Sequence, residues 1–245
     1  MTASPAPAGA PSSPAQDPAT RAALAWLHAA RFVTTAGRLD QLPAGDLPEF
    51  AFVGRSNAGK SSAINALAQH RRLAFSSRTP GRTQHINVFA LGPRDAPDAL
   101  LADLPGYGYA AVERTAKLRW QEVMADYLAV RRSLAGVVLM IDARRGFTDL
   151  DRQLLRWLEP RVGTGQVKLL VLLTKSDKLN RRDAQAALEQ AQQELSVLAG
   201  EHADIGVTLF SALSGRGVAD VAQALRAGVP AATASATAAP DPQPG

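Results

Sequence analysis

One stretch constrains the fold of this chain more than any other, namely Gly54-Arg55-Ser56-Asn57-Ala58-Gly59-Lys60-Ser61, which has the form G-x-x-x-x-G-K-S. A short apolar run at residues 50–53 precedes it, and a helical pattern with Ile64 and Leu67 on one face follows it. Glycines let the backbone curl around a phosphate, while the new helix N-terminus directs N–H groups at the anion. The motif therefore predicts a phosphate-binding loop between a strand and a helix, with Lys60 on the outer phosphates and the Ser61 hydroxyl on Mg²⁺.

The rest of the chain alternates between strand and helix patterns. Strands are expected at residues 50–53, 86–91, 99–103, 137–142, 167–173 and 207–210. Helices are expected from about Pro18 through Phe32, after the phosphate loop, and at residues 112–132, 150–158, 183–198 and 218–225. This order is typical of a mostly parallel sheet with helices on both faces, and the turn-rich residues 92–98 indicate a hairpin that places one antiparallel strand at an edge. The expected fold is an α/β P-loop NTPase with a six-stranded sheet.

Composition indicates where the domain begins and ends and which kinds of site and segment the sequence lacks. Residues 1–19 and 230–245 consist largely of Ala, Pro, Ser, Thr and Gly, so both are expected to be disordered tails around a single domain at residues 20–229. The chain has no cysteine, which excludes disulfides and thiolate metal sites. It shows neither a secretory signal pattern nor an apolar run near the ~20 residues that span a bilayer, so a cytoplasmic protein is expected, taken to be a monomer.

The chain is basic, with a formal net charge of +5. Adjacent arginine pairs recur along it, at Arg71-Arg72, Arg131-Arg132, Arg144-Arg145 and Arg181-Arg182. A basic body attracts polyanions, of which RNA is the commonest in solution, but a basic surface that only confers solubility is an equal alternative. The sequence shows no RNA-binding module and no DNA-binding motif.

A D-x-x-G motif, Asp103-Leu104-Pro105-Gly106, follows the third predicted strand. Ligands bind beyond the carboxyl ends of strands in open α/β sheets, so this position suits a phosphate site. The Asp103 carboxylate can hold Mg²⁺ through water, and Gly106 can offer its N–H to a γ-phosphate. Alone, the motif is equally compatible with a plain turn, and its place in the chain is what supports the phosphate interpretation.

Another strand end carries Thr174-Lys175-Ser176-Asp177, which fits the [NT]-K-x-D pattern of guanine-binding proteins. Guanine presents N–H donors on its Watson–Crick edge, and an ionised Asp177 only accepts hydrogen bonds. Adenine presents an acceptor at N1, which a carboxylate repels. Two charge-assisted bonds of roughly 1.5–3 kcal/mol each would favour guanine by about 10²–10⁴. Lys175 is expected to lie along the plane of the base.

Two further segments complete the expected site. Phe210-Ser211-Ala212 closes the last strand, where its backbone could meet guanine O6 and the serine hydroxyl could brace the loop. The polar loop after the phosphate-loop helix contains Thr79 and Thr83. Either threonine could complete the Mg²⁺ shell, and Thr83 is favoured because it is closer to the following strand. A loop that holds the γ-phosphate in this way relaxes after hydrolysis, which makes it a switch.

Together these segments resemble the EngB (YihA/YsxC) family of bacterial GTPases, which are Ras-like members of the TRAFAC class. The resemblance covers roughly residues 30–228 and is strengthened by Pro105-Gly106-Tyr107-Gly108-Tyr109. It implies a domain that binds GTP or GDP with Mg²⁺ through Ser61 and Thr83. By the same resemblance, the nucleotide site also includes Gly81, Arg82, Gln84 and His85. It further implies a role in assembly of the large ribosomal subunit and in normal cell division and septation.

The residue after the D-x-x-G motif bears on how hydrolysis is catalysed. Ras-like enzymes often place a glutamine directly after D-x-x-G to orient water, and Tyr107 occupies that position here. Slow intrinsic turnover is therefore expected, with Lys60 and Thr83 acting on the phosphates. Asn57 resembles the asparagine with which potassium-activated GTPases hold K⁺, so K⁺ stimulation is a hypothesis, beside the alternative that Asn57 only braces the loop. A ribosomal partner that reaches the switch loops is a second candidate activator.

Two other functions share part of this pattern. A P-loop ATPase or small-molecule kinase would have the first motif, but the turn at residues 174–177 argues against it. A module that holds nucleotide for structural reasons and rarely hydrolyses it is compatible with the missing glutamine. The occurrence of four motifs in this order, each at the end of a strand, favours a GTPase switch.

Overall fold

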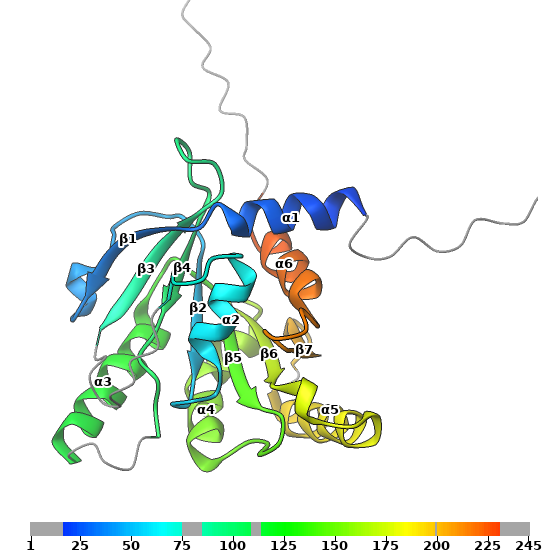
Figure 1. The fold of residues 1–245 in the computed structure, drawn as a ribbon. Helices are drawn as coiled ribbons and strands as arrows, with labels where there is room; N and C mark the ends of the chain where they lie inside the picture. The colour runs from blue at the N-terminus through cyan, green and yellow to red at the C-terminus, as the bar shows by residue number, and fades with distance from the viewer. Residues whose placement is uncertain (1–16, 75–84, 109–113, 199, 231–245) are drawn as a thin grey trace, which may run out of the picture.

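A seven-stranded sheet forms the centre of the structure (Figure 1). The computed structural model describes residues 17–74, 85–108, 114–198 and 200–230. The strands are β1 (Arg31–Ala36), β2 (Glu49–Gly54), β3 (Ile86–Leu91), β4 (Ala99–Asp103), β5 (Leu134–Asp142), β6 (Lys168–Thr174) and β7 (Ile205–Leu209). Their order across the sheet is β1-β3-β4-β2-β5-β6-β7. The pairs from β4 to β7 are parallel, whereas β3 is antiparallel to both of its neighbours.

Helices cover both faces of this sheet (Figure 1). They are α1 (Pro18–His28), α2 (Lys60–Leu67), α3 (Arg114–Val130), α4 (Asp149–Gly163), α5 (Arg181–Leu195) and α6 (Val218–Ala227), with 3₁₀ turns η2 (Leu39–Gln41), η3 (Ser176–Lys178) and η4 (Ser196–Leu198). Side chains of α3, α4 and α5 form one core with the sheet, and those of α1, α2 and α6 form the other. The α/β fold class and the strands predicted for β2 to β7 are confirmed.

Strand β2 shows why these residues form a central strand. It is buried along its whole length, and its alternate side chains enter the two cores. Ala51 and Val53 pack with α3, α4 and α5, while Phe50 and Phe52 pack on the opposite face. A strand buried on both faces has a near-continuous apolar sequence, as residues 50–53 do. The phosphate loop follows directly after β2 and therefore lies at the carboxyl edge of the sheet.

The predicted first helix is wrong at its C-terminal end. It begins at Pro18 as expected, with Asp17 as its N-cap, but it ends at His28 and does not continue through Phe32. Residues 31–36 form β1 instead, because Val33 and two threonines favour an extended backbone and Phe32 packs edge-on against Phe89 of β3, with ring centroids 6.0 Å apart. The sheet therefore has seven strands, with β1 at the edge and the antiparallel β3 inside it. Apart from residues 17–19 and 230, the predicted tails lie outside the described residues.

A buried ionic cluster anchors β2 at the end opposite the phosphate loop. Glu49, the first residue of β2, is fully buried and accepts a hydrogen bond from Arg131 Nη2 at 2.7 Å. The Tyr127 hydroxyl of α3 donates to the same carboxylate. Burial, and next the nearby Glu49 charge, raise the pKa of Tyr127 well above its ordinary value, so the phenol stays a hydrogen-bond donor. The cluster thus fixes α3 to the start of β2.

Replacing Glu49 by glutamine should destabilise the fold strongly, because the largely buried Arg131 guanidinium would lose its counter-charge. Breaking one side of such a pair costs about 3–5 kcal/mol of unfolding free energy. Urea unfolding followed by circular dichroism measures the loss. The matched control is Asp40→Asn, which makes the same chemical change in the exposed Arg38–Asp40 pair and should cost less than about 1 kcal/mol. Equal losses for the two variants would contradict the role given to Glu49.

Candidate nucleotide-binding site

The phosphate loop joins β2 to α2 and has an unusual backbone. Asn57 and Gly59 have positive φ angles of 67° and 96°, a region that glycine adopts readily and other residues rarely. Gly54 lies against β5, where an added Cβ would be 3.0 Å from the carbonyl oxygen of Met140. The loop leads directly into the first turn of α2, whose N–H groups have no partners within the helix and suit an anion.

Lys60 and Asp103 meet beside this loop. The Lys60 ammonium contacts Asp103 Oδ1, and their side chains are only 13% and 4% exposed. Asp103 ends β4, which pairs with β2 so that Asp103 lies opposite Phe52. The Asp103 carboxylate, together with the Ser61 hydroxyl in the first turn of α2, offers hard oxygen ligands next to a phosphate cradle. This donor set fits Mg²⁺, which takes few protein ligands besides phosphate oxygens and water.

The D-x-x-G segment is bound to the phosphate loop through its backbone. Leu104 and Pro105 are buried, and the Tyr107 carbonyl accepts a hydrogen bond from Ser56 N at 2.7 Å. At Gly106 an added Cβ would lie 3.3 Å from Ser56 N, so the two loops are in close contact. The predicted proximity of these two motifs is therefore present in the structure.

The side chain of Tyr107 is directed toward the first turn of α4. Its ring is buried, and its hydroxyl donates to Asp151 Oδ1 at 2.6 Å. Asp151 lies in the first turn of α4 and also accepts hydrogen bonds from Thr148 N and Oγ1, at 2.7 and 2.6 Å. Burial raises the pKa of Tyr107 well above its ordinary value, with the Asp151 charge as the second cause. Tyr107 thus attaches the D-x-x-G segment to α4.

The turn after β6 is bonded directly to the phosphate loop. Thr174 Oγ1 donates to the Ala58 carbonyl at 2.5 Å and lies 3.1 Å from the Ile141 carbonyl. Lys175 has a positive φ of 58°, and its Nζ donates to the Asn57 carbonyl at 2.6 Å. The first two residues of the predicted guanine motif therefore brace the segment expected to hold the phosphates.

Asp177, the predicted base-reading residue, is held by the turn after β7. Ser211 Oγ donates to Asp177 Oδ1 at 2.7 Å, and Ser176 N donates to the Phe210 carbonyl at 3.2 Å. The Ser211 hydrogen bond is the main cause that lowers the pKa of Asp177, so the carboxylate stays ionised and accepts hydrogen bonds. Ser211 is buried while Ala212 is exposed in the same turn. The structure thus places Thr174, Lys175, Ser176 and Asp177 between the phosphate loop and the turn after β7.

One predicted part of the site cannot be compared with the structure. Thr79, Gly81, Arg82, Thr83 and Gln84 lie outside the described residues, so the choice of Thr83 over Thr79 stays a prediction. His85 is described, and it is exposed directly before β3. The side chain of Asn57 is also exposed, at the tip of the phosphate loop.

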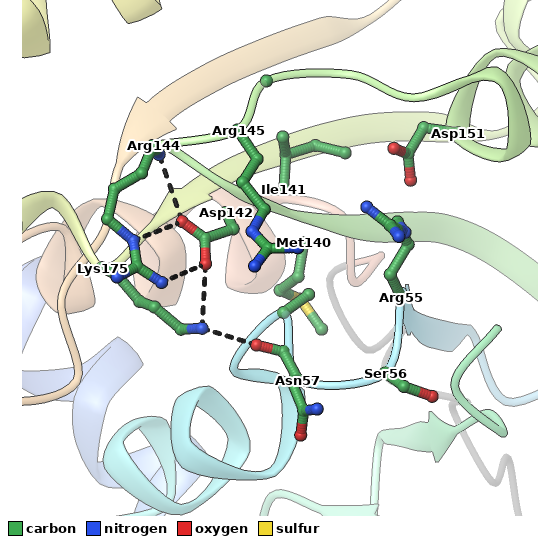
Figure 2. Close-up of a pocket in the computed structure, with 12 residues that line it drawn as sticks. Arg55, Ser56, Asn57, Met140, Ile141, Asp142, Arg144, Arg145, Asp151 and Lys175 are labelled. Carbon is green, nitrogen blue, oxygen red and sulfur yellow. Dashed lines mark hydrogen bonds and ion pairs between the residues drawn. The ribbon is translucent and has the colours of Figure 1, made fainter. Parts of the chain in front are cut away.

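Several other side chains at the same edge of the sheet were not predicted from the sequence. A cavity of ≈ 280 Å³ lies beside the phosphate loop, and Asp142, Arg144, Arg145 and Asp151 line it together with Arg55 and Lys175 (Figure 2). Asp142 is the last residue of β5. The rule that identified Asp103, a polar residue at the carboxyl end of a parallel strand, could have found Asp142 as well.

Comparison with known proteins agrees with this geometry. A sequence profile described as "50S ribosome-binding GTPase" matches residues 49–197, more than half of the chain. A "Probable GTP-binding protein EngB" from Acidovorax ebreus is 57% identical over 202 residues, covering 82% of this chain and 89% of that protein. A protein of the same name from a Polaromonas species is 54% identical over 226 residues, covering 92% of this chain and 89% of that protein.

The chain belongs to the EngB family.

Solved structures support the EngB fold. A crystal structure of a probable GTP-binding protein engB superposes with a TM-score of 0.53 at 20% identity, covering 74% of this chain and 97% of that one. Era, crystallised with MgGDPNP and nucleotides of 16S ribosomal RNA, has a TM-score of 0.58 at 18% identity, with coverage of 77% and 58%. At these identities the likeness concerns the fold. Among the described residues, no helix is both long and apolar enough to cross a bilayer.

Proposed function

We propose that this EngB-family protein is a GTPase switch that holds a Mg²⁺-bound guanine nucleotide between the phosphate loop and the turn at residues 174–177. The observation that carries the proposal is the direct bonding of these segments, from Thr174 to the Ala58 carbonyl and from Lys175 to the Asn57 carbonyl. A phosphate-binding segment and a base-reading segment joined in this way form one continuous site. Such a site can recognise both ends of a nucleotide.

Asp177 supplies the base specificity in this proposal. Its ionised carboxylate can accept hydrogen bonds from N1 and N2 of guanine, whereas adenine presents an acceptor at N1. Ser211 fixes Oδ1 and lowers the carboxyl pKa, which supports the charged form. The backbone at Ser211 and Ala212 is the proposed contact for guanine O6. A P-loop ATPase has no need of this arrangement.

Hydrolysis in this proposal depends on charge neutralisation more than on a general base. Lys60 and the N–H groups of the phosphate loop would hold the phosphates, and Ser61, Thr83 and, through water, Asp103 would hold Mg²⁺, which would supply positive charge to the phosphates. Because the Tyr107 hydroxyl is bonded to Asp151, Tyr107 does not position the attacking water. Intrinsic turnover should therefore be slow, on the order of 10⁻⁴–10⁻² s⁻¹.

The proposed partner is the large ribosomal subunit or its RNA. The description of the matching profile, which names 50S binding, and the net charge of +5 support this partner. We further propose a cytoplasmic monomer that assists assembly of the subunit and is needed for normal cell division and septation. The proposed domain extends over residues 20–229.

Asp177→Asn should weaken GTP binding about 10²-fold or more and shift preference toward xanthine nucleotides, because the neutral amide loses the charge-assisted bonds to N1 and N2. Titration of fluorescent GDP, with GTP, XTP and ATP as competitors, measures the change. Asp183→Asn, which alters an exposed carboxylate in the first turn of α5, is the control and should leave all affinities within about twofold. Unaltered GTP affinity in Asp177→Asn, or ATP bound as firmly as GTP by the wild type, would contradict base reading by Asp177.

The ribosomal partner is tested by sedimentation with purified subunits. The protein should pellet with the large subunit in the presence of a non-hydrolysable GTP analogue and much less with GDP or without nucleotide, because a switch binds its partner in one nucleotide state. The small subunit is the control. Sedimentation that is independent of the nucleotide would indicate simple basic adhesion and remove the switch from the proposal.

Monovalent cations provide a separate test of catalysis. We propose that Asn57 helps to hold K⁺ near the phosphates, where a cation offsets charge that develops during hydrolysis. GTP turnover should then be at least about tenfold faster in KCl than in NaCl, and Asn57→Ala should abolish the difference while nucleotide affinity is retained. Phosphate release at matched ionic strength measures the rates. Equal turnover in both salts would leave Asn57 as a brace for the loop.

A further inference from the structure

The carboxylate of Asp142 lies at the centre of contacts that join three turns at the carboxyl edge of the sheet (Figure 2). Its Oδ2 is 2.9 Å from Lys175 Nζ, in the turn after β6. The same Nζ donates to the Asn57 carbonyl of the phosphate loop at 2.6 Å. Asp142 is paired with Thr174 across the parallel strands, so its backbone position is set by the sheet itself. The carboxylate therefore connects a rigid strand end to a flexible lysine side chain.

Arg144 orients this carboxylate from the other side. Arg144 Nε donates to Oδ1 at 2.9 Å and Nη2 donates to Oδ2 at 2.7 Å, a two-pronged contact. The backbone N–H of Arg144 donates to Oδ1 as well, at 3.1 Å. Burial by itself would raise the pKa of Asp142, but the hydrogen bonds from Arg144 and then Lys175 outweigh it and hold the pKa well below its ordinary value. The side chain is 9% exposed, yet it stays charged.

Lys175 needs such an anchor. A lysine side chain has many rotamers, and it occupies one of them only where other groups fix its ammonium. Here two groups do so, the Asp142 carboxylate and the Asn57 carbonyl. Its backbone also has a positive φ of 58°, which a non-glycine residue adopts only where its surroundings impose it. The position of the turn that leads to Asp177 thus depends on contacts from two other loops.

We propose that Asp142 is a positioning residue for guanine nucleotide binding, which holds the Lys175 ammonium against the phosphate loop and so sets the spacing between the phosphate-binding and base-reading segments. Asp142 acts through Lys175 and does not itself contact the nucleotide. The inference rests on the proposed GTP-binding function. It adds a residue outside the four sequence motifs, on a strand that none of those motifs includes.

The first test is a double-mutant cycle on the release of fluorescent GDP. Asp142→Asn, which keeps the shape of the side chain but removes its charge, should increase the dissociation rate about tenfold. In a Lys175→Met background the same substitution should change the rate by less than about twofold, because the partner through which Asp142 acts is gone. An equal factor in both backgrounds would show that Asp142 acts on the fold and not through Lys175.

The matched control uses another aspartate–lysine pair, at the other end of β6. Lys168, at the opposite end of β6, is bonded to Asp204 at 2.6 Å in an exposed position. Asp204→Asn makes the same chemical change beside a β6 lysine, but far along the strand from the turn at residues 174–177. Its GDP dissociation rate should stay within about twofold of the wild type. A tenfold increase there would mean that loss of any such pair loosens the site, and would overturn the specific role of Asp142.

A second measurement needs no nucleotide and so separates this inference from the proposed function. Acetylation of individual lysines in the nucleotide-free protein is followed by peptide mass spectrometry. Asp142→Asn should raise the labelling rate of Lys175 severalfold and leave that of Lys168 unchanged, whereas Asp204→Asn should do the reverse. Unchanged labelling of Lys175 in Asp142→Asn would overturn the positioning role. Failure of the wild type to bind GDP, with labelling as expected, would count against the proposed function alone.

Discussion

A loop that turns its N–H groups inward toward an anion must turn its carbonyl groups outward, and those carbonyls need donors. This constraint connects most of the site. In this structure the outward carbonyls of Asn57 and Ala58 are bound by Lys175 and Thr174. The turn that would read the base therefore also completes the hydrogen bonding of the loop that would hold the phosphates. Loss of either segment would leave the other with unpaired polar groups.

The sheet brings together the segments that form these hydrogen bonds, although they are distant in the sequence. Parallel strands place their carboxyl ends on one edge, so turns separated by more than a hundred residues in sequence become neighbours. At the opposite edge of the sheet, the buried Glu49 carboxylate accepts hydrogen bonds from Arg131 and Tyr127. This cluster stabilises the fold and is not part of the nucleotide site. One strand, β2, thus has its fixed end in a buried ionic cluster and its functional end in the phosphate loop.

Tyr107, directly after the D-x-x-G motif, differs from the glutamine that Ras-like folds often have at this position. Where related folds place a glutamine, this chain has a buried tyrosine that is bonded to Asp151 at the start of α4. The segment after Asp103 is therefore bonded both to α4 and to the phosphate loop. In the proposed function, hydrolysis is therefore accelerated by a partner or a cation and not by Tyr107.

Much of the fold followed from local patterns. Apolar runs bounded by turns located β2 to β7, and motif spacing located Lys60, Asp103 and Asp177, because strands, phosphate loops and base-reading turns depend on residues close together in sequence. The edge strand β1 was missed, since Phe32 was assigned to the preceding helix and the short run at residues 31–36 becomes a strand only when β3 is available to pair with it.

The sequence by itself determined the class of site: a phosphate loop, an acidic residue beside it and a carboxylate able to read guanine. Only the tertiary structure decided how these parts are held, with Lys175 between Asp142 and the Asn57 carbonyl and Tyr107 turned toward Asp151. The physical reason is that a motif records which chemical groups a short segment carries. The partners of those groups come from other strands, and folding of the whole sheet brings them within hydrogen-bonding distance.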